Sequence, residues 1–299
     1  MERHDAADHG HLDHADHDDH DDFGGLERDL PRLIDRRRAL WIVGGGLGAL
    51  TLAACGSTTS AKSTATTVLG GGAFGGTAST LAAGSDAGSP GSCAKLPTET
   101  AGPYPGDGSN GPDVLTQSGV VRRDITSSFG SMSGSVTGVP LTMKFKVLNV
   151  AQGCTPYAGA AMYVWHCDAK GQYSLYSQGV TNQNWLRGVQ AADADGWVTF
   201  TTIVPGCYPG RWPHVHFEVY PTLAKANSPR NAVLTSQLAL PQDSCEKAYA
   251  TSGYSASASN LKGISLQRDM VFSDGWQTQL GTVTGDATSG MTVTLNVPA

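Results

Sequence analysis

The stretch Leu141-Thr142-Met143-Lys144-Phe145-Lys146-Val147 alternates apolar and polar side chains without interruption. Successive side chains of a β-strand point to opposite faces, so this pattern predicts a half-buried strand. Outward from it, apolar or alternating runs predict further strands at 160–165, 197–200, 214–219 and 291–297. An Asp195-Gly196 hairpin turn leads into the strand at 197–200. No segment has a long helical period with caps, so we predict an all-β fold, an antiparallel β-sandwich with long loops.

Composition divides the 299 residues into three parts. Residues 1–54 hold 6 of the 20 Lys and Arg and 12 of the 26 Asp and Glu, so the formal net charge of −6 belongs to this leader. Residues 55–92 are almost entirely Ser, Thr, Ala and Gly, which predicts a disordered linker. Residues 93–299 are long enough for one domain with a core, and their charges balance. A neutral domain lacks the electrostatic footprint of a nucleic-acid or membrane-surface binder, so no nucleic-acid partner is expected.

The leader predicts export. Three arginines at 36–38 precede an apolar run at 39–54, which is shorter than the ~20 residues of a membrane span and is typical of a twin-arginine-like signal sequence. Leu52-Ala53-Ala54-Cys55 resembles a bacterial lipobox, which predicts lipidation of Cys55. We expect a cell-envelope lipoprotein on the outer side of the cytoplasmic membrane, touching the membrane only through this anchor, or a secreted protein. An uncleaved signal anchor is the alternative.

Five cysteines besides Cys55 are present. In an exported protein an odd number predicts up to two disulfides and one free thiol. The sequence alone does not choose among the possible pairings. We favour Cys93–Cys154, place Cys207–Cys245 second, and expect Cys167 to be free.

One predicted strand carries two histidines, His214 and His216, at alternate positions. Such residues share a face, so both imidazoles can reach one metal ion, although this spacing also occurs on plain polar surfaces. The loop Pro205-Gly206-Cys207-Tyr208-Pro209-Gly210-Arg211-Trp212-Pro213 precedes the strand, and its Gly and Pro residues fix the backbone around Tyr208. A tyrosine held so firmly is either structural packing or a preorganised ligand. The same two interpretations apply to Tyr173 and Tyr176 in the loop after residue 165.

Four motifs together resemble the intradiol ring-cleavage dioxygenase family. They are Thr100-Ala101-Gly102-Pro103-Tyr104, Arg122-Arg123-Asp124-Ile125, and the stretches Trp165–Ser174 and Arg187–Phe217. The resemblance spans about residues 93–273. It implies a catalytic β-sandwich with long active-site loops and an oxidoreductase that inserts both atoms of O2 into a catechol-type ring. The implied partners are a small aromatic diol and O2, and the implied product is a muconate-type dicarboxylic acid.

The resemblance also implies a single non-haem iron(III) as cofactor. Its implied ligands are Tyr173, Tyr208, His214 and His216. Tyr173 is chosen over Tyr176 because the first ligand of the family follows Gly-x directly. Phenolates are hard anionic donors that favour iron(III). In the family the axial tyrosinate, here Tyr208, is displaced by the substrate and takes up protons.

Further roles follow from the same resemblance. Arg211 is the implied catalytic residue that stabilises negative charge developing on the ring, although a surface arginine beside a proline loop is the alternative. Gln237 matches a catalytic glutamine. Gly102, Pro103, Tyr104 and Trp165 are implied substrate-binding residues, although each could belong to the core.

The chain also departs from the family pattern. Cys207 stands where an aromatic or proline is commoner, and the N-terminal helical segment used for dimerisation is not recognised, so the oligomeric state stays open. Arg187 and Lys225 are cations that could meet a substrate carboxylate, and the sequence does not place them.

Two other functions compete. One is a zinc or copper enzyme built on His166, His214 and His216. His166 follows Trp165, so on a continuous strand it faces the opposite side from that tryptophan. The other is a lipid-anchored β-sandwich binding module without catalysis.

Overall fold

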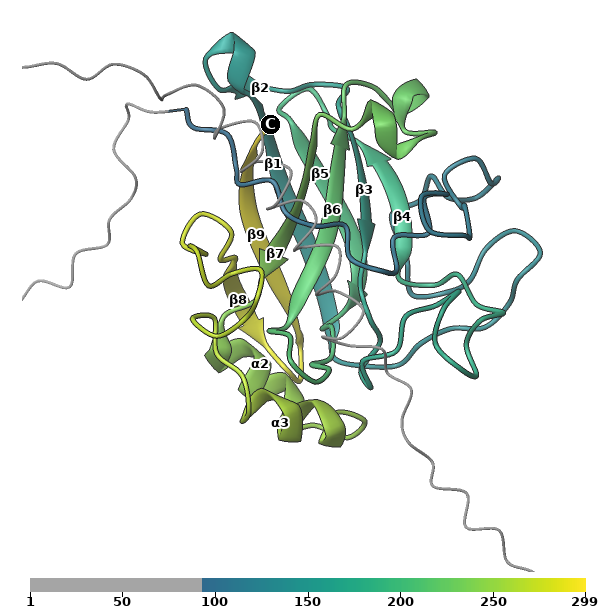
Figure 1. Cartoon of the computed structure of the whole chain (residues 1–299), viewed down its shortest axis with the longest axis vertical. Coiled ribbons are helices and arrows are strands. Elements are labelled where there is room, and N and C mark those ends of the chain that lie inside the picture. Colours follow the sequence, from purple (N-terminus) through teal and green to yellow (C-terminus); the bar gives the residue numbers. More distant parts are fainter. Residues whose placement is uncertain (1–92) are drawn as a thin grey trace, which may run out of the picture.

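Two β-sheets pack against each other in the computed structural model, which describes residues 93–299 (Figure 1). The first sheet has the order β2-β1-β9-β8, with β5 also paired to β1, and the second has the order β4-β3-β6-β7. The strands are β1 (Pro140–Asn149), β2 (Thr155–Pro156), β3 (Ala161–Trp165), β4 (Arg187–Ala191), β5 (Trp197–Ile203), β6 (His214–Tyr220), β7 (Leu234–Ala239), β8 (Thr282–Asp286) and β9 (Gly290–Pro298). The short 3-10 helices are η1 (Val150–Gln152), η2 (Leu223–Lys225) and η3 (Pro229–Asn231).

The predicted all-β sandwich is confirmed, and each predicted strand forms. One pairing differs from a purely antiparallel sandwich, because β1 and β9 run parallel, with Phe145 opposite Leu295. This pairing joins strands about 150 residues apart in the sequence. Local patterns predict that each is a strand and cannot predict that they are neighbours.

The main core lies between the sheets. Strand β1 contributes its inward-facing residues Met143, Phe145 and Val147, and β6 contributes Val215 and Phe217. The rings of Phe145 and Phe217 have centroids 5.6 Å apart, which joins the two sheets directly. Apolar and polar residues alternate on β1 because one face packs into the core and the other is partly exposed, as predicted.

The second sheet is covered on its outer side as well. The segment that begins at residue 93 crosses β7, β6, β3 and β4 (Figure 1). It is bonded to this sheet along its course: Glu99 N donates to Thr235 O, and the hydroxyl of Tyr163 donates to Pro105 O. All seven residues of β6 and all five of β3 are therefore buried. This double burial creates the enclosed layer in which the predicted ligands lie.

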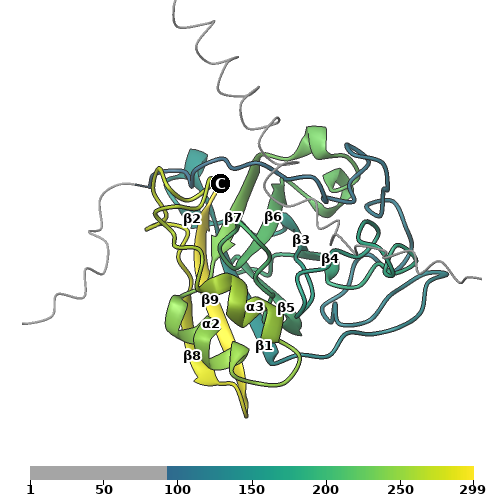
Figure 2. The ribbon, with the colours of Figure 1, turned by 60° about the horizontal axis from the view of Figure 1, so that its bottom comes forward.

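Two short helices, α2 (Gln242–Tyr249) and α3 (Ser255–Leu261), lie side by side at one end of the sandwich (Figure 2). Neither was predicted, because helices of seven or eight residues leave too short a period to recognise. Between residues 93 and 299, no helix has the length and apolar character needed to cross a bilayer. The export signal, the lipidation of Cys55 and the linker lie outside the described residues.

Candidate metal centre

The register of the second sheet sets one row of side chains on its outer face. Arg187 on β4 pairs with Trp165 on β3, Trp165 pairs with His216 on β6, and His216 pairs with Gln237 on β7. The tryptophan and histidine rings stack with centroids 5.0 Å apart and an interplanar angle of 2°. The stacking on Trp165 thus helps to fix the ring orientation of one predicted ligand, His216.

His214 and His216 converge as predicted from their alternate positions. Their Nε2 atoms lie 3.1 Å apart, and both residues are 2% exposed. The Nδ1 atom of His214 lies 2.5 Å from the carbonyl oxygen of Trp212. A carbonyl only accepts, so Nδ1 carries the proton, and the Nε2 lone pair points to the centre.

Tyr173 and Tyr208 bring their hydroxyl oxygens to the same point. The oxygen of Tyr173 lies 3.4 Å from His214 Nε2, and that of Tyr208 lies 3.5 Å from the same nitrogen. The two tyrosine rings meet edge to face, with centroids 5.8 Å apart. Four donor atoms from two loops and one strand thus surround one small volume.

The loop that carries Tyr173 can approach Tyr208 because Gly171 has no side chain. Gly171 has φ +89°, and a Cβ at this position would lie 3.0 Å from Cβ of Tyr208. Beyond Tyr173, Leu175 has a left-handed φ of 74°, which is uncommon for such a residue. Strained backbone of this kind persists where surrounding structure fixes it, as at binding loops.

The loop that carries Tyr208 is fixed by the two helices. Tyr249 on α2 donates its hydroxyl to Pro205 O at 2.8 Å. On α3, the hydroxyl of Ser257 accepts from Cys207 N at 2.9 Å, and Asn260 donates to Cys207 O at 2.8 Å. The Gly and Pro residues around Tyr208 therefore provide only part of the rigidity, and α2 and α3 supply the rest.

The spacing of the donors fits a metal ion. Two ligand atoms bound at about 2.1 Å lie about 3.0 to 3.4 Å apart for angles between 90° and tetrahedral. The three other donor atoms lie 3.1 to 3.5 Å from His214 Nε2. Two phenol oxygens and two imidazole nitrogens also match the donor types that hold iron(III).

Burial favours the neutral forms of Tyr173, His214 and His216. Burial, followed by the neighbouring Tyr208, raises the pKa of Tyr173 well above its usual value. Burial also lowers the pKa of both His214 and His216 well below the usual value, with the Arg211 guanidinium acting in the same direction. Neutral imidazoles are the form that binds metals, and a bound cation would favour the ionised phenolates.

Arg211 and Gln237 lie directly beside Tyr208. Arg211 is fully buried, and its Nη1 atom lies 3.4 Å from the hydroxyl oxygen of Tyr208. Its Nη2 atom donates to Gln237 Oε1 at 2.7 Å, and Gln237 Nε2 donates to Thr100 O at 2.9 Å. A fixed positive charge at this place favours negative charge on a molecule bound at the centre.

The residues predicted to bind substrate divide into two groups. The ring of Tyr104 lies against the ligand ring of Tyr173, with centroids 4.8 Å apart, and is partly exposed. Trp165 is fully buried, and its indole nitrogen has no hydrogen-bond partner among the described residues. Gly102 and Pro103 are buried in the segment that covers the sheet, where Gly102 has φ +67°.

His166 does not join the cluster. Its Nδ1 lies 2.8 Å from Cys167 O, and its Nε2 lies 2.7 Å from the hydroxyl of Thr202 on β5. Thr202 belongs to the first sheet, so His166 faces away from the site, as its position after Trp165 predicts. Over residues 93–299, no group of three or more His, Cys, Asp or Glu side chains is arranged to hold a metal ion. The three-histidine hypothesis has no support in this geometry.

The structure also shows the pairing of the cysteines and the positions of Arg187 and Lys225. Cys93 and Cys154 form the favoured disulfide, while Cys167, Cys207 and Cys245 are free and buried, so the second-choice pair does not form. Arg187 is buried and donates to Pro105 O and to the carbonyl of Ser174, while Lys225 is exposed.

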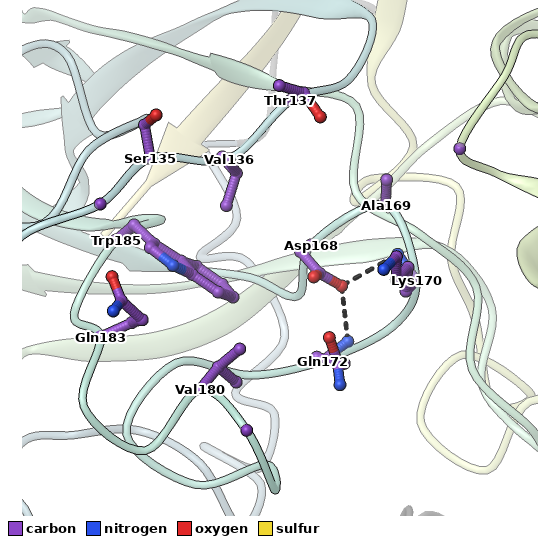
Figure 3. A pocket seen from close by; sticks show the side chains of 13 residues that line it. Ser135, Val136, Thr137, Asp168, Ala169, Lys170, Gln172, Val180, Gln183 and Trp185 are labelled. Carbon is purple, nitrogen blue, oxygen red and sulfur yellow. Dashed lines mark hydrogen bonds between the residues drawn. The ribbon is translucent and has the colours of Figure 1, made fainter.

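A separate cavity of about 400 Å³ lies beside the loop 168–172 (Figure 3). Trp185, Val136 and Val180 line it, together with the polar residues Asp168 and Lys170. Asp168 Oδ1 accepts from the backbone of Lys170 and of Gln172, which shapes this loop. None of the four donor residues lines this cavity.

Sequence reasoning missed Asp269. Its carboxylate forms a salt bridge with Arg211 at 3.0 Å, and both side chains are fully buried. Asp269 lies in the stretch Arg268-Asp269-Met270, which shows no motif and no periodic pattern. The one sequence signal that could have indicated a buried Asp269 is the pair of apolar residues that follows it, Val271 and Phe272.

Together the fold and the site define a β-sandwich protein with a buried two-histidine, two-tyrosine centre. Residues 110–244 match the sequence model of a protein family described as Dioxygenase. This part of the chain contains the four donor residues, Arg211 and Gln237. A search of curated protein sequences returned no match.

Solved structures provide a second comparison. The chain is similar to an intradiol ring-cleavage dioxygenase from Tetranychus urticae, with 22% identity, a TM-score of 0.53, and coverage of 69% of this chain and 94% of that one. It is similar to the dioxygenase domain of a dioxygenase carbohydrate-binding protein fusion from Streptomyces sp. SirexAA-E, with 26% identity, a TM-score of 0.43, and coverage of 68% and 97%. It is also similar to 3-chlorocatechol 1,2-dioxygenase from Rhodococcus opacus 1CP, with 17% identity, a TM-score of 0.42, and coverage of 68% of this chain and 71% of that one. The first of these shows a shared fold.

The matched segment, residues 110–244, is similar in sequence to the dioxygenase family. The predicted resemblance to the intradiol ring-cleavage dioxygenases is confirmed, and so is the prediction of an oxidoreductase of that class.

Proposed function

We propose that this protein is a non-haem iron(III) dioxygenase that cleaves a catechol-type ring between its two hydroxyl-bearing carbons. Both atoms of O2 enter the product, which is a muconate-type dicarboxylic acid. One observation carries the proposal: His216 Nε2 and the hydroxyl oxygens of Tyr173 and Tyr208 all lie 3.1 to 3.5 Å from His214 Nε2, in a buried volume next to Arg211.

Tyr173, Tyr208, His214 and His216 would hold the iron. When bound, iron(III) supplies Lewis acidity and a template that orients the diol. The chain's own residues do the rest. The oxygen of Tyr208, which lies beside Arg211, is placed to take a proton from a substrate hydroxyl. Arg211 holds a positive charge where the ring gains negative charge, and Gln237 holds Arg211.

The substrate class follows from the groups near the centre. The partly exposed ring of Tyr104 beside Tyr173 offers an aromatic surface for a planar ring. Arg187 is buried, and four of its five N–H groups donate to Ser174, to the carbonyl of Pro105 and to the Tyr163 hydroxyl, so it is poorly placed to bind a substrate carboxylate. A neutral catechol is therefore the first substrate to test. Export at the cell envelope, with Cys55 as the lipid anchor, would let the enzyme meet plant-derived or xenobiotic catechols.

The test is a visible spectrum and iron analysis of the purified protein, before and after anaerobic addition of catechol. We expect a red-brown band from tyrosinate-to-iron(III) charge transfer, one iron per chain, and a shift of the band when catechol binds. Product formed under ¹⁸O₂ should carry both labelled atoms by mass spectrometry. A colourless protein that takes up no iron and binds no catechol would disprove the proposal.

A further inference from the structure

The guanidinium of Arg211 is held on three sides. Its Nε atom bonds Asp269 Oδ2 at 3.0 Å, its Nη2 atom donates to Gln237, and its Nη1 atom faces the oxygen of Tyr208. Arg211, Gln237 and Asp269 are all fully buried. A buried cation is unfavourable without a partner, and the salt bridge with Asp269 supplies a negative charge beside the guanidinium.

Asp269 is itself fixed by its neighbours. Its Oδ2 atom also accepts from the backbone N–H of Trp212 at 2.6 Å, and its Oδ1 atom accepts from Val271 N at 2.8 Å and Phe272 N at 3.1 Å. Four donors on one carboxylate leave it little freedom to move. The backbone N–H of Trp212 is thus held by Asp269, while the carbonyl of the same residue faces Nδ1 of His214.

On the basis of the proposed function, we infer that Asp269 is a positioning residue for the reaction. It acts on Tyr208 and Gln237 through Arg211, and on His214 through the backbone of Trp212. The outer partners of metal ligands act in this way, setting the orientation and the donor strength of groups that they do not replace. The carboxylate also balances the arginine charge, which would otherwise act uncompensated on the Tyr208 oxygen and the neighbouring donors.

The test compares wild type with Asp269→Asn, loaded with iron(III) and supplied with catechol. We expect kcat to fall by about 10- to 100-fold, with KM changing by less than about threefold. The unbalanced guanidinium stabilises the phenolate of Tyr208, so the charge-transfer band should move to shorter wavelength. An unchanged kcat and band would overturn the inference.

The control is Tyr254→Phe. Tyr254 is fully buried, and its hydroxyl donates to Val204 O and accepts from Val139 N, two groups that do not bond Arg211 or Asp269. This variant should lose stability and keep the wild-type kcat and band position. A control that loses kcat as Asp269→Asn does would mean that the effect is only structural. If Asp269→Asn does not fold, Asp269→Glu takes its place. It keeps the charge and displaces the guanidinium, so kcat should still fall about 10-fold, and a wild-type kcat would overturn the inference.

A second readout needs no metal. Thermal unfolding of the metal-free proteins Asp269→Asn, Arg211→Gln and the double variant forms a double-mutant cycle. Each single variant leaves one buried charge unpaired, so the double variant should unfold at a higher temperature than either. Additive losses would show no coupling and overturn the inference. A wild-type protein with neither band nor cleavage would overturn the proposed function and this role together. A working wild type beside an equally active Asp269→Asn overturns only the role of Asp269.

Discussion

The two sheets share one core and differ on their outer sides. In β1 and β9 of the first sheet, buried positions alternate with partly exposed ones, so one face meets water. In β3 and β6 of the second sheet every residue is buried, because the segment from residue 93 and the ligand loops cover the outer face. A polar side chain is harmless on the first sheet's outer face. On the outer face of the second sheet, a buried polar side chain needs a hydrogen-bond or metal partner, and the residues of the candidate site lie on this face.

Strand β6 shows the same difference across its own two faces. Val215 and Phe217 enter the main core, while His214 and His216 enter the covered layer. Neighbouring residues therefore serve different purposes, one face for stability and the other for the site. The following predictions test this separation.

The largest effect should come from the site face of β6. Replacing His216 with Ala removes one of the four donors, so we expect loss of the iron band and of ring cleavage to below detection. Metal-free protein should unfold cooperatively, and its melting temperature should fall less than that of the Phe217→Ala variant. Iron analysis, a visible spectrum and calorimetry measure this. Retained iron and activity would contradict the assignment.

The core face of β6 should show the opposite outcome. Phe217→Ala removes a fully buried ring that contacts Phe145 of the other sheet, and should cost about 3 to 5 kcal/mol of unfolding free energy. Urea unfolding measures the loss. The folded fraction should keep the iron band and its shift with catechol, because the ring points away from the site. If the band disappears while the fold survives, the two faces are not independent.

A smaller effect concerns the segment that covers the second sheet. Burial, and then the nearby Asp274, raises the pKa of Glu99 from 4.5 to about 7. The folded protein thus keeps a proton that the unfolded chain loses, and stability falls as pH rises from about 4.5 to 7. In metal-free protein, Glu99→Gln should reduce this fall and gain about 1 to 3 kcal/mol above pH 7, while Glu218, whose pKa burial also raises to about 7, keeps the remaining slope.

Asp286, at the exposed end of β8, provides the control. Hydrogen bonds from Ser289 lower the pKa of Asp286. The carboxylate therefore contributes to stability at pH values above the usual Asp pKa, and this contribution is lost only in more acidic solution. Asp286→Asn should therefore leave the slope between pH 4.5 and 7 unchanged. Urea unfolding at several pH values measures both variants. An unchanged slope in Glu99→Gln would show that the carboxylate is solvated.

The smallest effect should come from the water-facing side of the first sheet. Thr294 is a partly exposed residue of β9, paired with Lys144 of β1. Thr294→Val should change stability by less than about 0.5 kcal/mol and leave kcat unchanged. Thermal unfolding and a steady-state assay check this. A clear loss of activity would mean that the outer face of the first sheet contributes to function.

The sequence determined the strands and the family because both are recorded in local patterns. Alternation at 141–147 reflects a strand with one wet face, and the alternate histidines share a face by the geometry of any strand. The ligand set came from motifs whose spacing is kept. The double burial of His214–Tyr220 was not visible, since alternation of polar and apolar residues normally means a half-exposed strand.

Contacts between distant segments were decided by the tertiary structure alone. The parallel pairing of β1 with β9, the Cys93–Cys154 disulfide, the clamping of Tyr208 by α2 and α3, and the Asp269–Arg211 pair all join residues far apart in the chain. Asp269 has no local signature, because a carboxylate in a short loop has the same residue neighbours whether it meets water or a buried guanidinium. Its role comes from burial beside Arg211, and burial is a property of the packed chain.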